Sequence, residues 1–264
     1  MLPHLFVWLA ATLLAGAPAS HAGSDARYDA FGKGEYVQYR IHYGLITAGY
    51  ASTEVMPHTA YEQGRPCHHI VGLGWTHPGF DWFYKVRDRY ETYIDEQSLL
   101  ALRFNRHIAE GGFESYTETY FDQTRHQARY IDEHKRETRY DVPPGIQDVI
   151  SAFFYARSAY DGSSLAIGDR ISLRNFLDRK TFNLEARLRS REIVKVGDKS
   201  FDALCFDLLI DDAGMITDGS TIRFWISDDA NKVLLRVESE LTIGSLKADI
   251  MTWQNLRHPF SALR

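Results

Sequence analysis

The sequence predicts a mainly β protein, a large antiparallel sheet curved strongly into an open barrel or spiral, with one amphipathic helix near the middle of the chain. Three observations favour this fold class. Apolar and polar residues alternate with a period of two along most of the chain, turn-forming residues separate the alternating runs, and a single segment shows helical spacing instead. Counting the runs between turns gives roughly 13–15 strands.

The alternating runs are typical of half-buried antiparallel strands, because successive side chains of a strand point to opposite faces. The clearest runs span residues 36–43, 84–94, 221–227, 234–241 and 245–253. Turn signals between runs include Tyr43-Gly44, Glu110-Gly111-Gly112, Gly197-Asp198-Lys199 and Asp218-Gly219. We therefore expect one continuous sheet without an internal repeat.

The exception to the two-residue period follows the breaker Pro143-Pro144-Gly145. Apolar residues recur there at helical spacing, namely Ile146, Val149, Ile150, Phe153 and Phe154. Asp148 in the first turn and Arg157 in the last turn suit the helix dipole. We expect a helix from Gly145 to Ser158, which either plugs the open side of the curved sheet or crosses over one of its edges.

The first residues predict export. An apolar run, 5–17, is too short to span a bilayer comfortably, and the small residues Ser20 and Ala22 suit the pockets of a signal peptidase. We expect residues 1–22 to be a signal peptide cleaved after Ala22, and residues 23–264 to form a single β-rich domain, soluble in the periplasm. An uncleaved N-terminal anchor is the alternative. No cysteine follows the run, which argues against a lipoprotein anchor, and no later stretch is long enough to cross a membrane.

Charge and cysteine content narrow the function classes. The net charge is −5 and no basic stripe is present, which argues against a nucleic-acid partner. Cys67 and Cys205 could form a single disulfide in an oxidising compartment, or remain two buried thiols. Cys67-His68-His69 offers adjacent metal ligands, but neighbours on a strand point to opposite faces, so we expect no metal site and no cofactor. Local catalytic motifs are lacking, so an enzyme is the less favoured class, although a glycosidase or lyase assembled from distant residues would leave no such motif.

Binding residues are expected on the inner face of the sheet and at its rim. Asp88 shares one strand face with Val86 and Tyr90, where a buried carboxylate needs a partner. It is either a polar anchor in a ligand cavity, or it is satisfied by an internal salt bridge or by hydrogen bonds to a loop. Five aromatic residues within 74–84 suggest the lip of a cavity, a platform for sugar rings, or ordinary loop packing. The candidate lining and rim residues are Tyr39, Tyr43, Trp75, Trp82, Asp88 and Tyr90.

The last predicted strand carries two further candidates. Lys247 and Asp249 lie on one face, opposite Leu246 and Ala248. They could grip a polar head group, pair with neighbouring strands, or simply form a solvated face.

Several blocks of the sequence resemble one family. These are Gly34-Glu35-Tyr36 with Ile41-His42-Tyr43-Gly44, the run 83–94, the run 147–155, Trp225-Ile226-Ser227-Asp228-Asp229, and the run 244–249. Together they are similar to domain of unknown function 3108, a family of Gram-negative envelope proteins. The resemblance implies an envelope protein and brings no catalytic residue with it. A weaker architectural similarity links the expected fold to the open barrels of lipoprotein carrier and acceptor proteins.

These features together suggest a periplasmic protein that binds an apolar or lipid-like ligand, such as an acylated molecule, in a concave apolar face and serves envelope maintenance. One alternative is an envelope protein that binds or cleaves polysaccharide. Another is a structural partner of envelope assembly proteins. The oligomeric state does not follow from the sequence.

Overall fold

The computed structural model describes residues 29–211 and 222–264. The predicted signal peptide 1–22, with its cleavage site, and the expected turn at Asp218-Gly219 lie outside the described residues. Within them, fifteen strands form a single sheet. Their bounds are β1 Tyr36–Tyr43, β2 Ile46–Val55, β3 Ala60–Glu62, β4 Arg65–Thr76, β5 Arg87–Asp95, β6 Ala101–Glu110, β7 Phe113–Asp122, β8 Gln127–Ile131, β9 Glu137–Asp141, β10 Arg170–Leu177, β11 Lys180–Val196, β12 Lys199–Asp211, β13 Ile222–Ser227, β14 Leu234–Glu240 and β15 Ser245–Gln254.

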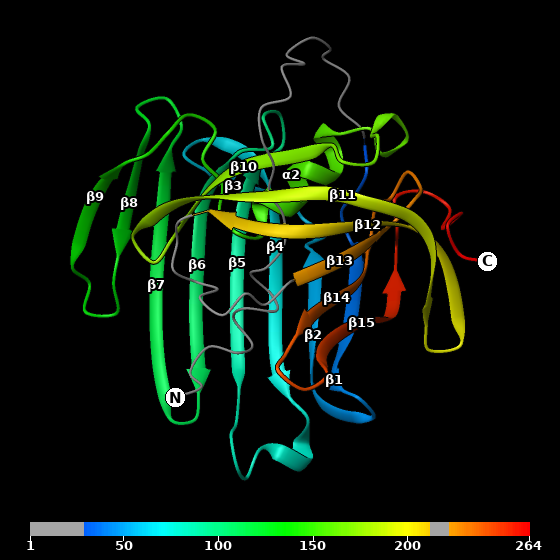
Figure 1. Cartoon of the computed structure of the whole chain (residues 1–264). Coiled ribbons are helices and arrows are strands. Elements are labelled where there is room, and N and C mark those ends of the chain that lie inside the picture. Colours follow the sequence, from blue (N-terminus) through cyan, green and yellow to red (C-terminus); the bar gives the residue numbers. More distant parts are fainter. Residues whose placement is uncertain (1–28, 212–221) are drawn as a thin grey trace.

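The sheet is antiparallel throughout and strongly curved. Its strand order is β10-β11-β12-β13-β14-β15-β1-β2-β4-β5-β6-β7-β8-β9, with the short β3 paired to β4. The first and last strands of the chain, β1 and β15, are therefore neighbours in the centre of the sheet. In Figure 1, β10, β11 and β12 cross in front of the upright strands β4 to β7, so the sheet curls over its own inner face. The predicted fold class is confirmed.

The alternation of buried and exposed side chains along each strand shows which residues face the inside of the curved sheet. On β5, Asp88, Tyr90 and Thr92 are buried, whereas Arg87 and Arg89 are exposed. The pairing of β1 with β2 shifts between Ile41 and His42, where Ala48 is the extra residue on β2. Tyr39 and Ile41 of β1 are buried as expected, whereas Tyr43, the last residue of the strand, is 40 % exposed.

The helix α2, Ser151–Ala159, starts later than the sequence predicts and lies inside the curl. Asp148 does not sit in its first turn but caps it: Asp148 Oδ1 accepts hydrogen bonds from the Ile150 and Ser151 amides at 2.8 and 2.9 Å. Ser151 Oγ accepts from the Asp148 amide in return, which completes a reciprocal cap. Asp148 Oδ2 accepts from Thr92 on β5, which fixes the helix start to the sheet. Of the two expected placements, the helix as a plug is the one observed.

The two edge strands of the sheet meet indirectly. Gln147 donates its backbone N–H to Arg174 on β10, while its side chain bonds the backbone of Leu99 and Ala101 beside β6. Phe176 of β10 packs against Tyr140 of the other edge strand, β9, with ring centres 5.4 Å apart, and edge-on against Phe121 of β7 at 6.2 Å. Aromatic contacts and the hydrogen bonds of Gln147 therefore hold the two ends of the sheet together, although their strands do not pair.

A buried ion pair ties the helix to the first described residues and to the turn between β13 and β14. Arg157 and Glu35 are each 2 % exposed at the side chain, and the guanidinium donates to both carboxylate oxygens at 2.6 and 2.9 Å. Arg157 also donates to the carbonyls of Ala30 and Asn231. These bonds satisfy the charges, which would otherwise be costly inside the protein.

No helix in the part of the chain that the structure describes has the length and apolar character needed to cross a bilayer.

Candidate functional site

An apolar cavity of about 50 Å³ opens on the inner face, between the centre of the sheet and the start of α2. Small residues on β2 and β4 form its floor: Ala51 lies opposite Gly74, and Thr53 opposite Gly72. Larger apolar residues form its walls, namely Tyr39, Ile41, Ile150, Leu234, Val237 and Ala248. The space stays open because the floor residues have small side chains or, in the two glycines, none.

The two glycines differ in how much room they leave. A Cβ built on Gly72 would approach Ile150 Cδ1 at 3.2 Å, so the helix start packs directly on that position. A Cβ on Gly74 would meet nothing closer than Asp88 Cβ at 3.9 Å, which is an ordinary contact distance. The free volume is therefore concentrated beside Gly74 and Asp88.

Polar groups line one side of this otherwise apolar cavity. The Tyr90 hydroxyl is buried and has no hydrogen-bond partner among the described residues. Burial, together with the Asp88 carboxylate, raises the Tyr90 pKa well above its usual value, so the hydroxyl stays protonated. An O–H group without a partner inside a protein is costly, and a ligand oxygen or a water molecule would relieve that cost.

Asp88 and Glu110 form a pair of carboxyl groups next to Tyr90. Asp88 Oδ1 accepts from the Ala109 amide at 3.0 Å, and the side chain of Asp88 is hydrogen-bonded to Glu110. Burial, with the nearby Glu110 charge, raises the pKa of Asp88 to about 7. Two carboxyl groups can bond each other only if one of them carries a proton, so below about pH 7 Asp88 is protonated and shares its proton with Glu110 in this hydrogen bond.

The structure brings together three of the predicted site residues and separates the others. Tyr39, Asp88 and Tyr90 line the cavity. Trp75 points to the opposite face of β4, where its ring lies 5.8 Å from that of Tyr50. Trp82 is 84 % exposed in the turn between β4 and β5.

Lys247 and Asp249 lie on the outer face and are held by neighbouring strands. Asp249 accepts from Arg236 at 2.5 and 2.7 Å and lies 3.1 Å from His42 Nε2. Although burial disfavours its charged form, the bonds from His42 and Arg236 lower the Asp249 pKa to about 2. Lys247 pairs with Glu238 on β14 at 3.4 Å. Of the alternatives that the sequence left open, pairing with neighbouring strands is the one observed.

The possible disulfide is absent. Cys67 on β4 and Cys205 on β12 are both buried free thiols, and their strands are not neighbours in the sheet. Burial raises the pKa of each thiol to about 11, so both remain protonated. Cys67 donates to the Arg65 carbonyl at the start of its own strand, and His69 of the same strand bonds Glu91.

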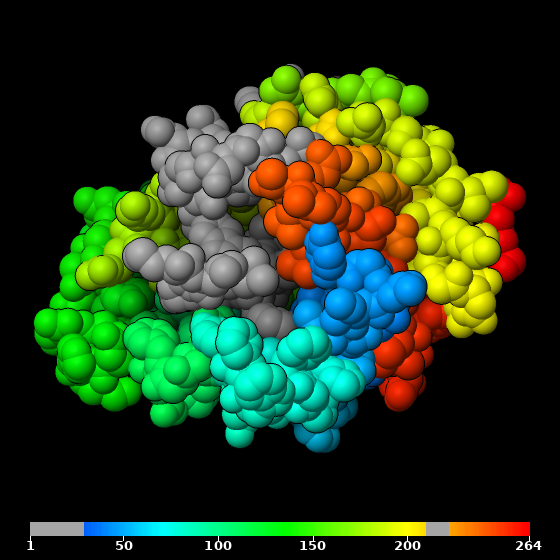
Figure 2. Space-filling model, turned by 60° about the horizontal axis from the view of Figure 1, so that its bottom comes forward, coloured from blue at the N-terminus to red at the C-terminus, as the bar shows by residue number. Residues whose placement is uncertain are grey.

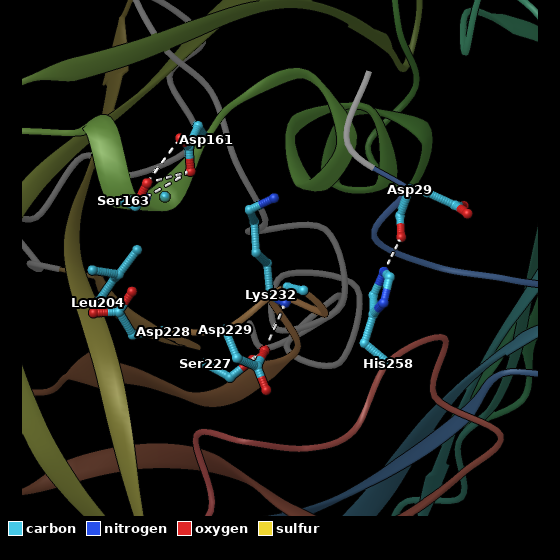
Figure 3. A pocket seen from close by; sticks show the side chains of 11 residues that line it. Asp29, Asp161, Ser163, Leu204, Ser227, Asp228, Asp229, Lys232 and His258 are labelled. Carbon is cyan, nitrogen blue, oxygen red and sulfur yellow. Dashed lines mark hydrogen bonds between the residues drawn. The ribbon is translucent and has the colours of Figure 1, made fainter. Parts of the chain in front are cut away.

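A second, more polar cleft of about 430 Å³ lies beyond the C-terminal end of α2 (Figure 3). Its acidic side chains serve local structure: Asp161 accepts from Ser163, and Asp229 accepts from Ser227 and from the Lys232 amide. The Lys232 ammonium donates to the Arg157 carbonyl at 2.9 Å, and burial lowers its pKa to about 8. Among the described residues that line this cleft, none has the flat Trp or Tyr ring that a sugar platform requires.

Several residues in the cavity or beside it were not singled out from the sequence. Glu110, next to Asp88, was noted only as part of a turn signal, Gly74 only as the first residue of the aromatic run 74–84, and Ala51 and Gly72 were not noted at all. The signal that could have found them is the Gly72-Leu73-Gly74 run inside a predicted strand, since glycine in a strand often marks a close approach or a space for a ligand.

The fold and the cavity together define an open, β-barrel-like protein with an apolar interior. Within that class, the chain belongs to the family described as Protein of unknown function (DUF3108), whose model matches residues 38–251. This confirms the resemblance found in the sequence.

One solved structure supports the fold, and a second similarity is weaker. A β-barrel-like protein of domain of unknown function DUF1849 from Brucella abortus is similar with a TM-score of 0.55 and 9 % identity, over 83 % of this chain and 96 % of that one. A candidate lipoprotein from Parabacteroides distasonis aligns with a TM-score of 0.32 and 9 % identity, over 88 % of this chain and 100 % of that one. No protein of curated function matches the sequence.

Proposed function

We propose that this chain is a periplasmic binding protein for an apolar or lipid-like ligand and serves maintenance of the cell envelope. The observation that carries the proposal is the apolar cavity over Ala51 and Gly74, with the unpartnered Tyr90 hydroxyl at its side. The apolar run at residues 5–17 and the family membership support export to the envelope.

The size of the cavity limits what it holds. Pockets for drug-sized ligands usually measure about 300–1,000 Å³, and this cavity measures about 50 Å³. We therefore propose that it receives the end of an acyl chain rather than a whole lipid, with the Tyr90 hydroxyl available to a carbonyl or hydroxyl oxygen. Burial of apolar surface, at about 25 cal/mol per Å², would provide the affinity.

A cavity-filling variant tests the proposal. The protein is exported in a bacterial host, purified from the periplasm without detergent, and analysed by native mass spectrometry, followed by solvent extraction of any adduct. We expect a fatty-acyl adduct on the wild type, its loss in Gly74→Leu, and its retention in Thr252→Leu, which adds the same side chain at an exposed position of β15.

A transient carrier could purify empty, so the same three proteins are also titrated with a fluorescent fatty acid. Saturable binding that Gly74→Leu weakens and Thr252→Leu leaves intact supports the proposal. If the wild type binds no probe, or if both variants bind it equally well, the cavity is not an acyl site. A glycan array then becomes the appropriate test of the polysaccharide alternative.

A further inference from the structure

Exposed apolar side chains gather at one end of the sheet. Of the fourteen large apolar side chains that are exposed in the described part of the chain, nine lie in or beside four turns. These nine are Tyr43, Leu45 and Ile46 (β1–β2), Phe80, Trp82 and Phe83 (β4–β5), Phe113 (β6–β7), and Leu241 and Ile243 (β14–β15). We call them the apolar rim.

The topology places all four turns side by side. The strands they connect are consecutive in the order β14-β15-β1-β2-β4-β5-β6-β7, and each neighbour is antiparallel, so every one of these turns falls at the same end. This is the lower end of the sheet in Figure 1. Figure 2, in which that end comes forward, shows atoms of the blue, cyan and orange turns close together on one face.

The opposite end of the same strands has a different character. The turns there, 56–64, 96–100 and 123–126, include Glu62, Glu96 and Arg125, and Tyr61 is their one exposed large apolar side chain. In the rim turns, 43–47, 77–84, 111–113 and 241–244, the one formally charged residue is Asp81, which Arg87 pairs at 2.5 Å. The two ends of the strands from β14 to β7 therefore differ sharply in polarity. The next turn along the sheet at the rim end, β8–β9, is charged instead and carries Asp132, Glu133, Lys135 and Arg136, so it bounds the apolar surface on that side.

Interactions between and within turns hold the rim in place. The Tyr43 hydroxyl donates to the Ile243 carbonyl at 2.8 Å, which joins the β1–β2 and β14–β15 turns. The Tyr84 ring covers Gly111 so closely that a Cβ there would overlap it, and this contact joins the β4–β5 and β6–β7 turns. Trp82 Nε1 donates to the Gly79 carbonyl of its own turn. Contacts between and within the turns therefore fix the backbone that carries the exposed rings and aliphatic side chains.

We propose that the apolar rim docks this protein onto the surface of a lipid bilayer. Separate turn tips that carry Trp, Phe, Leu and Ile and almost no charge suit insertion into the interfacial layer of a membrane, which is fluid and accommodates projections of any shape. A protein partner would instead need a continuous surface with a polar border. The cavity residues Ile41, Gly74 and Asp88 lie near this end of their strands, so docking would bring the cavity close to the membrane.

The test is flotation of the protein, purified from the periplasm of a bacterial host, with phosphatidylcholine vesicles, with and without added phosphatidylglycerol. We expect binding to both kinds of vesicle with weak dependence on salt, because the tips bind through apolar burial. The quadruple variant Leu45→Ser, Trp82→Ser, Phe83→Ser, Ile243→Ser should bind more than about tenfold more weakly, and these four exposed positions are not part of the core. The matched control carries Tyr61→Ser, Ile167→Ser and Ile193→Ser, exposed apolar positions away from the rim, and should bind as the wild type does.

Lipid insertion is read directly by brominated lipids, which should quench tryptophan emission in the wild type and much less in Trp82→Phe. The proposal is overturned if the wild type does not float, if the rim variant floats equally well, or if the control variant loses binding to the same extent. Self-association that the rim variant abolishes, without any flotation of the wild type, would assign the rim to a second copy instead. Docking does not depend on the proposed ligand, so Gly74→Leu should float normally even if the cavity holds no acyl chain.

Discussion

The shared proton of Asp88 and Glu110 makes stability depend on pH, and Asp88→Asn should remove that dependence. Asp88 is 3 % exposed, and burial with the nearby Glu110 charge raises its pKa from the ordinary value of 3.8 to about 7. Asparagine keeps the oxygen that accepts from the Ala109 amide and places an N–H₂ donor toward Glu110. The variant thus imitates the protonated form of Asp88 at every pH.

The sign of the effect follows from proton linkage. Between about pH 4 and pH 7 the folded protein retains a proton on this pair that the unfolded chain has lost, so the free energy of unfolding falls as the pH rises through that range. A pKa raised by about three corresponds to a change of ~4 kcal/mol in the free energy of unfolding, if nothing screens the charge. The Ala109 amide and solvent near the pair reduce this, so we expect a loss of ~2 kcal/mol in the wild type between about pH 5 and pH 8.5.

Urea unfolding at the two pH values measures the effect. The wild type should lose ~2 kcal/mol more than Asp88→Asn on going to the higher pH, and the variant should equal or exceed the wild type there. Glu91→Gln on the outer face of the same strand is the control. Burial disfavours the charged form of Glu91, but bonds from Arg89 and His69 lower its pKa, so its contribution has the opposite sign. A wild type and an Asp88→Asn variant with parallel pH profiles would refute the shared-proton argument.

Three further predictions concern stability and the cysteines. Glu35→Gln leaves the buried Arg157 charge without its carboxylate and should lower the free energy of unfolding by about 3–5 kcal/mol in urea, whereas a loss below about 1 kcal/mol would contradict the structure. Gln147→Leu removes the side-chain bonds to the backbone of Leu99 and Ala101, which fix the segment beside β10 to the β5–β6 region, and should cost about 2–5 kcal/mol; unchanged stability would show that this connection does not depend on them. Cys67 and Cys205 should react slowly with a thiol reagent in the native protein and fast in urea, because both thiols are buried and protonated. Mass spectrometry of the untreated protein should give the mass of the reduced chain, and a mass about 2 Da lower would reveal a disulfide.

Local patterning was enough to predict the strands and the inner face of several of them. The bounds of β1 agree with the expected 36–43, and β5, β13, β14 and β15 fall close to their predicted runs. Asp88 and Tyr90 are on the inner face as expected, because side-chain direction in a regular strand follows directly from the period of two. Tyr43 was predicted as a lining or rim residue, and it lies at the end of β1, where it is 40 % exposed and outside the cavity.

Features that depend on the path of the whole chain could not be predicted. The helix α2 starts later than predicted because Asp148 caps it, and a hydrogen bond from Thr92 on the distant strand β5 holds Asp148 in that position. The cavity floor forms because β2 and β4 pair directly, although β3 separates them in the sequence. The apolar rim is a similar case. The aromatic turn at 74–84 stood out in the sequence, but Leu45 and Ile243 join it only through the strand order of the folded sheet.

The account depends most on the cavity as the place where an apolar chain is bound. A fatty acid carrying a photoreactive diazirine near the end of its chain, cross-linked to the purified protein and mapped by peptide mass spectrometry, tests this directly. The label should fall on β4, β5 and β14, near Gly74, Tyr90 and Leu234, and Gly74→Leu should abolish it. Labelling spread over the outer face, or confined to the apolar rim and unchanged by Gly74→Leu, would contradict the claim that this cavity binds an acyl chain.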